Sequence, residues 1–95
     1  MIRNVVLVRL KPEHDRGALR DLMARFQVLN CPGTISYTIG ADAGLRDADN
    51  WSFAIVADFT DAASYRAYDE DEEHNRLRGV LGPMAERVAR VQFEI

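Results

Sequence analysis

His74 and Tyr68 are the side chains of this 95-residue chain whose chemistry points most directly to a reaction. A histidine titrates near neutral pH and can therefore take a proton from an acidic carbon. A tyrosine hydroxyl can donate a hydrogen bond to a carbonyl oxygen, such as that of a thioester, on which negative charge develops. These two residues are the candidate catalytic residues.

Both residues also have an ordinary structural explanation. Tyr68 can pack beneath a helix while its hydroxyl stays in contact with water. His74 can lie at the start of a helix and hydrogen-bond to the acidic residues that precede it. The sequence therefore supports two hypotheses for these side chains, a catalytic pair and two structural residues.

The segment 69–73 consists of five consecutive acidic residues. In the first interpretation it is a solvated helix N-terminus, where free N–H groups favour negative charge. In the second, its field keeps His74 more protonated. In the third, Glu70, Asp71 and His74 share one helix face and bind a cation. No pattern fixes the number of ligands, so we expect no metal.

Charge and composition narrow the classes of protein to which this chain can belong. Apolar residues make up 47% of the chain and charged residues 28%, which is sufficient for a folded core. The net charge of −3 argues against nucleic acids and anionic membranes, because both select for a basic surface. We therefore expect no nucleic-acid partner and no membrane partner.

The number of cysteines and the absence of cofactor motifs further narrow the classes of protein to which the chain can belong. Cys31 is the only cysteine, which excludes an internal disulfide and a multi-cysteine zinc site. Glycine-rich phosphate loops and haem-attachment motifs are absent from the sequence, so we expect no cofactor. No secretory signal is expected in residues 1–10, because Arg3, Asn4 and Arg9 interrupt the apolar residues. These features predict a cytoplasmic protein.

Hydrophobic periodicity predicts the elements that must position the candidate residues. Alternating and β-branched segments predict strands at 2–10, 34–39, 51–59 and 88–95, with a polar loop at 40–50. Helical spacing predicts a helix at 14–29 and a second helix capped by Thr60 or Asp61. A third helix begins near the acidic run, and Gly82-Pro83 kinks or ends it.

The resulting order β-α-β-β-α-α-β predicts an α+β protein with a ferredoxin-like sandwich and a four-stranded antiparallel sheet. The uninterrupted apolar segment 5–8 suggests that the first strand is covered on both faces. Helices of this chain can cover only one face. A second copy is the simplest cover for the other, so we expect a homodimer that forms through the open face of the sheet.

Four segments carry a resemblance to a known family: MIRNVVLVRLKP, CPGTISYTIGADAG, NWSFAIVADFTDAASYRAY and ERVARVQFEI. On these segments, which span nearly all of the chain, it resembles the stress-responsive α/β barrel family, also called Dabb. The resemblance implies one Dabb-like domain over residues 1–95 and a dimeric α/β barrel built from two sheets.

The family includes plant stress proteins and polyketide cyclases of the olivetolic acid cyclase type, which close a ring by aldol condensation without a metal. In these cyclases a histidine follows a tyrosine by six residues, and Tyr68 and His74 keep that spacing. Two other histidines common in the family are replaced here, one by Asn4 and one by Asp71. Asn4 can hydrogen-bond to a ligand but cannot act as a base.

The sequence thus predicts a stress-responsive Dabb-type protein that binds a small, largely apolar organic molecule in an interior pocket, with acid–base chemistry from Tyr68 and His74. Candidate ligand-binding residues are Asn4, Val6, Val8, Phe26, Ile55, Tyr65 and Leu77. Two alternatives stay open: a cyclase-like lyase that acts by aldol cyclisation, and a structural stress-related protein without catalysis. Neighbouring barrel families add a monooxygenase-like activity as a weaker alternative.

Overall fold

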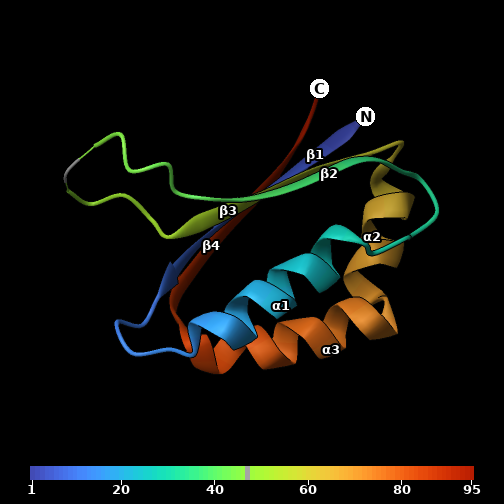
Figure 1. Cartoon of the computed structure of the whole chain (residues 1–95). Helices are drawn as coiled ribbons and strands as arrows, with labels where there is room; N and C mark the ends of the chain where they lie inside the picture. Colours follow the sequence, from blue (N-terminus) through green and yellow to red (C-terminus); the bar gives the residue numbers. More distant parts are fainter. Residues whose placement is uncertain (47) are drawn as a thin grey trace.

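The computed structural model describes residues 1–46 and 48–95 and has the predicted order of elements (Figure 1). The elements are β1 (Ile2–Leu10), α1 (Arg16–Gln27), β2 (Thr34–Ala41), β3 (Phe53–Phe59), α2 (Ala62–Glu70), α3 (Glu72–Leu81) and β4 (Ala85–Glu94). A short 3₁₀ turn, Gly82–Met84, joins α3 to β4. The predicted α+β fold with one four-stranded antiparallel sheet is confirmed.

The strands lie in the order β2-β3-β1-β4, and every neighbouring pair is antiparallel. All three helices lie on one side of this sheet (Figure 1). Because side chains alternate along a strand, Asn4, Val6 and Val8 of β1 point to the helices. The register places Gln92 of β4 beside Asn4 and Arg90 beside Val6.

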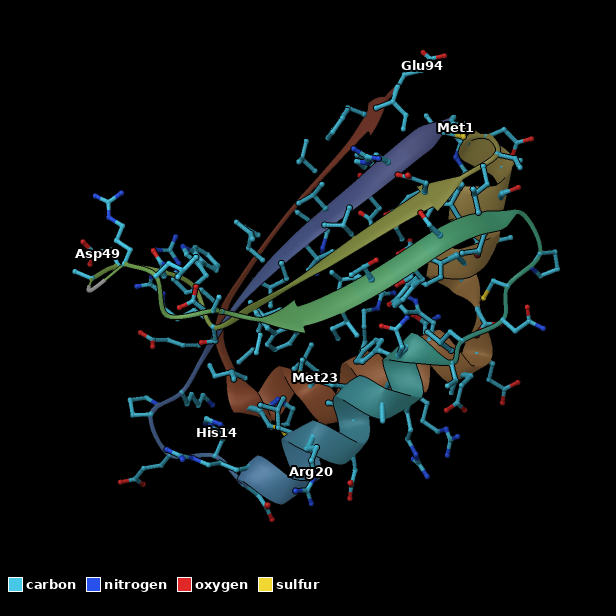
Figure 2. The ribbon with its side chains drawn as sticks, turned by 45° about the horizontal axis from the view of Figure 1, so that its top comes forward. Met1, His14, Arg20, Met23, Asp49 and Glu94 are labelled. Carbon is cyan, nitrogen blue, oxygen red and sulfur yellow. The ribbon has the colours of Figure 1, made fainter. Side chains whose placement is uncertain are left out.

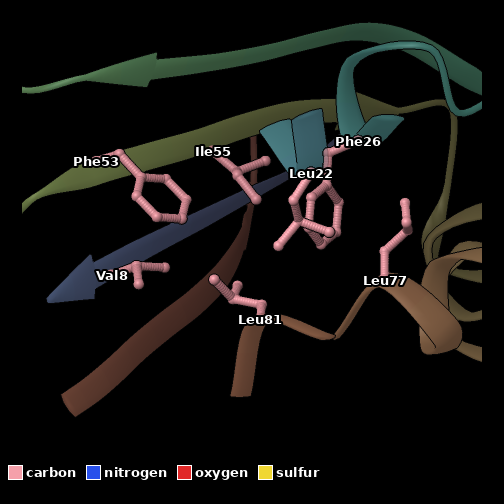
Figure 3. Packing of buried hydrophobic residues seen from close by; sticks show 7 residues of the cluster. All are labelled: Val8, Leu22, Phe26, Phe53, Ile55, Leu77 and Leu81. Atoms are coloured by element: carbon pink, nitrogen blue, oxygen red, sulfur yellow. The ribbon is translucent and has the colours of Figure 1, made fainter. Parts of the chain in front are cut away.

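The core lies between the helices and the centre of the sheet. Its seven buried residues come from β1, β3, α1 and α3 (Figure 3), and they are Val8, Leu22, Phe26, Phe53, Ile55, Leu77 and Leu81. Full burial of one such apolar side chain stabilises the fold by about 1.5–3 kcal/mol. This cluster therefore holds α1 and α3 against the sheet and fixes the positions from which the site is built.

The opposite face of the sheet carries apolar side chains that no helix covers. Leu7, Val91 and Phe93 are 38%, 55% and 43% exposed, respectively. In the same layer, the Arg3 guanidinium donates two hydrogen bonds to the Asp58 carboxylate, of 2.8 and 2.9 Å. The Arg3 contact lowers the pKa of Asp58. This face, which we call the open face, is continuous from β4 to β3.

Several element boundaries differ from the predicted ones. The first helix begins at Arg16, because the Asp15 carboxylate accepts a hydrogen bond from the Ala18 N–H and caps it. The predicted loop at 40–50 begins too early, because Gly40 and Ala41 still pair with β3. That loop also includes Asp47, which lies outside the described residues.

The predicted start of the third strand is too early, and that of the last strand is too late. The third strand begins at Phe53 instead of at 51. The last strand begins at Ala85 instead of at 88, because the 3₁₀ turn at Gly82–Met84 ends the helical segment sharply and β4 pairs with β1 from Leu10 onward. The β4 strand therefore begins three residues earlier than predicted.

Gly33 fixes the corner between α1 and β2. Its φ of +85° lies in the left-handed region that favours glycine. A Cβ at this position would overlap the side chain of Ser64 on α2. The Gly33 carbonyl also accepts a hydrogen bond of 2.9 Å from the Thr60 N–H. This corner therefore holds α2 close to the start of β2.

The two ends of the chain lie side by side at one end of the sheet (Figure 1). The Ile95 N–H donates a hydrogen bond of 3.0 Å to the Met1 carbonyl. Asp49 lies at the opposite end (Figure 2). Within residues 1–46 and 48–95, no helix is long and apolar enough to cross a bilayer.

Candidate functional site

A cavity of about 160 Å³ lies between the helix-bearing face of the sheet and helices α2 and α3. Its lining residues are Asn4, Val6, Phe26, Ile55, Tyr65, Tyr68, Asp69, His74, Arg78, Leu81, Gly82, Val88 and Arg90. The wall is mainly apolar, and the polar groups come from α2, α3 and the two strands β1 and β4. Such a combination is typical of small-molecule sites.

The structure brings together seven of the nine predicted site residues around this cavity. They are Asn4, Val6, Phe26, Ile55, Tyr65, Tyr68 and His74. Val8 and Leu77 do not line it: they are 0% and 1% exposed and belong to the packed core. A step of two residues along β1, from Val6 to Val8, or of one turn along α3 decides whether a side chain meets the cavity or other core residues.

Six lining residues are not among the predicted site residues, namely Asp69, Arg78, Leu81, Gly82, Val88 and Arg90. Arg78 follows His74 by four residues, so helical spacing alone places both on one face. Arg90 and Gln92 are two residues apart on β4 and therefore lie on the same face of the sheet. This strand pattern could have indicated a charge that faces the cavity. The remaining members depend on the angle between α3 and the sheet, which no local pattern encodes.

Asp71 fixes the geometry between Tyr68 and His74. Its backbone N–H donates a hydrogen bond of 3.1 Å to the Tyr68 carbonyl and closes the end of α2. Its carboxylate accepts a hydrogen bond of 2.9 Å from the His74 N–H and caps the start of α3. One residue therefore ends the helix that carries the tyrosine and begins the helix that carries the histidine.

His74 is 5% exposed and is packed between two aromatic rings. Its imidazole lies 4.0 Å from the Tyr68 ring, centroid to centroid, and 6.2 Å from the Phe26 ring. The Nδ1 atom is buried and has no hydrogen-bond partner among the described residues. A buried polar atom without a partner costs about 1–3 kcal/mol, so this nitrogen is a natural contact for a bound molecule.

The surroundings of His74 lower the pKa of its imidazole. Burial is the main cause, and the positive charge of Arg78 acts in the same direction. A hydrogen bond with the Asp69 backbone and the negative charges of Asp69 and Asp71 raise the pKa, but their effect is smaller. The acidic run therefore acts in the direction of the second interpretation, but burial and Arg78 outweigh it, so the net shift lowers the pKa of His74. A neutral imidazole is the form that can accept a proton.

Tyr68 is 3% exposed, and its hydroxyl lies 2.9 Å from the hydroxyl of Tyr37 on β2. Burial raises the pKa of both phenols, that of Tyr37 to about 12. Both groups are therefore neutral hydrogen-bond donors at pH 7. Only one of the two hydroxyl protons is used in their mutual bond, which leaves the other for a second acceptor.

Asn4 supplies the polar floor of the cavity on the sheet, and Gln92 of β4 holds its side chain. Asn4 is 3% exposed, and its side-chain oxygen accepts a hydrogen bond of 2.8 Å from the Gln92 amide. The pair joins β1 to the edge strand β4 at a position where the register places the two residues side by side. The Asn4 amide nitrogen remains available as a donor.

The acidic run serves mainly to cap and brace the helices. Asp71 caps α3, Asp69 accepts a hydrogen bond of 3.0 Å from Arg78, and Glu73 pairs with Arg76. These contacts agree with the first interpretation of the run. Among residues 1–46 and 48–95, no three His, Cys, Asp or Glu side chains form a group that could hold a metal ion.

Cys31 does not line the cavity; it lies in a second buried cluster, with Ala57, Phe59 and Tyr68. Burial and the nearby Asp71 carboxylate raise the pKa of its thiol. The thiol form is poorly nucleophilic, so the arrangement does not favour a covalent role.

The family model of the stress responsive A/B barrel domain, Dabb, matches residues 2–95. The chain belongs to this family. A comparison with curated proteins gives no match. The Dabb assignment agrees with the resemblance seen in the sequence and with the observed order of strands and helices.

Solved structures place this Dabb protein among dimeric ferredoxin-like folds. A dimeric ferredoxin-like protein of unknown function from Thermobifida fusca is 26% identical, with a TM-score of 0.85 over 99% of this chain and 90% of that chain. A hydroxynitrile lyase from Passiflora edulis is 18% identical, with a TM-score of 0.85 and coverage of 99% and 92%. A Dabb family protein from Mesorhizobium loti is 19% identical, with a TM-score of 0.75 and coverage of 99% and 95%.

Proposed function

We propose that this Dabb protein is a homodimer whose protomers each bind a small, largely apolar organic molecule in the cavity beside His74. The observation that carries the proposal is the buried, unpartnered Nδ1 of a histidine that lines an apolar cavity. An imidazole there would contact a polar atom of the bound molecule. The apolar wall would bind the rest of it.

The volume of the cavity limits the size of the ligand. An engineered, apolar protein cavity of about 150 Å³ binds benzene. The cavity described above has a comparable volume of about 160 Å³. A molecule with one ring, or a short branched chain, is therefore the largest that we expect inside the wall, although longer substituents can extend past the exposed residues of β4.

The electrostatics favour His74 as a general base in this proposal. Its lowered pKa keeps the imidazole neutral at pH 7, and Asp71 holds its backbone in place. Removal of a proton from a carbon beside a carbonyl would place charge on the carbonyl oxygen, where a Tyr68 hydroxyl proton can stabilise it. The same step begins an aldol cyclisation, and a lyase is already among the similar folds.

The dimer in this proposal forms through the open face. The Thermobifida fusca protein is dimeric and covers nearly the whole chain, which supports this arrangement. The exposed Leu7, Val91 and Phe93 would lose contact with water in a sheet-to-sheet contact. Each cavity would lie on the outer side of its own sheet, next to its own helices.

The binding part of the proposal can be tested with benzyl alcohol as the probe. We expect it to shift the amide and methyl NMR signals of Ile55 and Leu81. Val6→Phe fills the cavity and should abolish these shifts. Val80→Phe is the matched control, because Val80 is 46% exposed on α3 and does not line the cavity. Unchanged shifts with Val6→Phe would place the binding elsewhere.

The catalytic part can be tested by deuterium exchange of the methyl protons of acetophenone in D₂O. His74 would take one proton, the C–H electron pair would move onto the carbonyl oxygen as an enolate, and solvent would return a deuteron to carbon. We expect the protein to accelerate the loss of the methyl signal, and His74→Gln to remove most of the acceleration. His14→Gln is the control. Binding without exchange would reject the catalytic part and leave a binding protein.

A further inference from the structure

The charged side chains that line the cavity include more positive than negative groups. Arg78 and Arg90 line it together with Asp69, while the whole chain has a net charge of −3. Because the pKa of His74 is lowered, its imidazole adds no positive charge at pH 7. The two arginines therefore exceed the one carboxylate in a protein that is acidic overall.

The two arginines differ in what they already bind. Arg78 donates hydrogen bonds to the Asp69 carboxylate at 3.0 Å and to the Asp69 carbonyl at 3.2 Å, and it also contacts the Asn75 side chain. Arg90 forms no hydrogen bond or ion pair with any residue in 1–46 or 48–95. The Arg90 guanidinium is thus available to a ligand, and Arg78 adds a fixed positive charge.

Tyr65 supplies a further donor on the same side of the cavity. It lines the cavity from α2, and burial and the Asp69 charge raise the pKa of its hydroxyl, against the smaller opposing effects of Arg90 and Arg78. The Tyr65 hydroxyl has no hydrogen-bond partner among the described residues. A guanidinium and a phenol at one edge of an apolar wall form a typical arrangement for a planar acceptor with two oxygens.

We propose that the ligand of this cavity is a small carboxylate whose compact apolar body packs against Val6, Phe26 and Ile55 and whose carboxylate pairs with Arg90. This proposal rests on the proposed binding function and adds the charge and class of the ligand. A cation would be repelled by the two arginines. A neutral ligand would form no ion pair with Arg90, which is exposed to solvent.

A ligand carboxylate at Arg90 would also determine how the ligand lies relative to His74. Arg78 follows His74 by one helical turn on α3. Arg90 lies on β4, where it pairs with Val6 of β1. A carboxylate at Arg90 would therefore direct the ring of a one-ring acid inward, toward the imidazole. For an acid with a carbonyl carbon in its side chain, this orientation would bring that carbon next to the base.

The test compares benzoate with benzyl alcohol, which share the ring and differ in charge. We expect benzoate to bind about tenfold more tightly, since hydrogen bonds to charged groups are the stronger ones. Arg90→Gln should remove this preference, and Arg90→Lys should restore part of it because the charge is kept without the planar fork. Dissociation constants from NMR titrations give the ratio, and circular dichroism verifies that each variant is folded.

Arg20→Gln is the matched control for overall charge, because Arg20 is exposed on α1 and lies far from the sheet (Figure 2). This variant should keep the tenfold preference. Equal binding of benzoate and benzyl alcohol by the native protein would overturn the carboxylate proposal and leave the binding function intact. If neither probe binds, both proposals are rejected. A preference that survives in Arg90→Gln would assign the carboxylate to another group and also overturn it.

Discussion

The imidazole of His74 and the phenol ring of Tyr68 lie face to face, with centroids 4.0 Å apart and planes inclined by 33°. Two different helices carry these rings, and the single residue Asp71 joins the helices. The contact means that neither ring can move without the other. Any substitution at one position therefore changes the packing of the other, so glutamine is the suitable replacement for His74 and phenylalanine for Tyr68.

The pH dependence of stability should report the burial of His74. Burial lowers the pKa of the folded imidazole below its usual 6.5, whereas the unfolded chain binds the proton at the ordinary pKa. Between these two values the unfolded state holds more protons, so stability falls as the pH drops through about 6.5. Each unit of pKa depression is worth about 1.4 kcal/mol.

Urea unfolding at pH 7.5, 6.5 and 5.5 measures this effect. His74→Gln should flatten the dependence in that interval. His14→Gln should not, because His14 lies near the protein surface and its ring contacts only the Lys11 carbonyl. Equal slopes for the native protein and His74→Gln would show that the imidazole is not held neutral by the fold.

The hydrogen bond between Tyr37 and Tyr68 should be visible in a double-mutant cycle. Loss of either hydroxyl leaves the other buried without its partner, at a cost of about 1–2 kcal/mol. The double variant Tyr37→Phe/Tyr68→Phe should cost less than the sum of the two single variants. Urea unfolding of the four proteins gives the coupling free energy, and strict additivity would contradict the bond.

The same variants separate a catalytic from a structural role of Tyr68. If its hydroxyl stabilises the carbonyl oxygen of a substrate, Tyr68→Phe should slow acetophenone exchange at least about tenfold, since one such donor is worth about 10²–10³ in established cases. Tyr37→Phe should slow it far less. Equal effects of both variants would indicate a structural role only.

The open face should be the dimer interface. Val91→Asp places a charge in a contact that we expect to be dry, so the variant should sediment as a monomer at about 10 µM, where the native protein is a dimer. Val80→Asp is the control: Val80 and Val91 are 46% and 55% exposed, but Val80 lies on α3, on the helix side of the sheet. A dimer that survives Val91→Asp would place the interface elsewhere.

Gly33 and Gly44 form a pair in which backbone strain and steric overlap can be separated. Both have positive φ, of 85° and 72°. A Cβ at Gly33 would overlap Ser64, whereas a Cβ at Gly44 meets nothing within 4 Å. We expect Gly44→Ala to cost about 1 kcal/mol and Gly33→Ala about 3 kcal/mol or more, measured by thermal unfolding. Similar costs would mean that α2 can move away.

The fold could be predicted from the sequence because its signals are local. Alternation placed all four strands, and the aspartates at positions 15, 61 and 71 mark the helix starts. Tyr68 and His74 were found by their chemistry and their spacing. The contacts around them were not, because the partner hydroxyl of Tyr37 lies 31 residues away and belongs to another strand.

The charged edge of the cavity was the largest omission. Arg90 lies in the predicted last strand but was not among the candidate ligand-binding residues, although the structure places it on the cavity wall. Val8 and Leu77 were expected in the pocket because they are apolar and face inward. Hydrophobic pattern distinguishes inside from outside, but it does not distinguish a packed interior from a hollow one.

The two faces of the edge strand β4 have different surroundings. Val91 and Phe93 point to the open face, while Val88 and Arg90 line the cavity. A strand clamped by a second protomer would fluctuate less, so the residues on its other face would be better ordered for a ligand. By reciprocal linkage, a ligand would then tighten the dimer, and dilution would lower the apparent affinity of each cavity. In such a protein, the concentration of the chain itself becomes a regulator of occupancy.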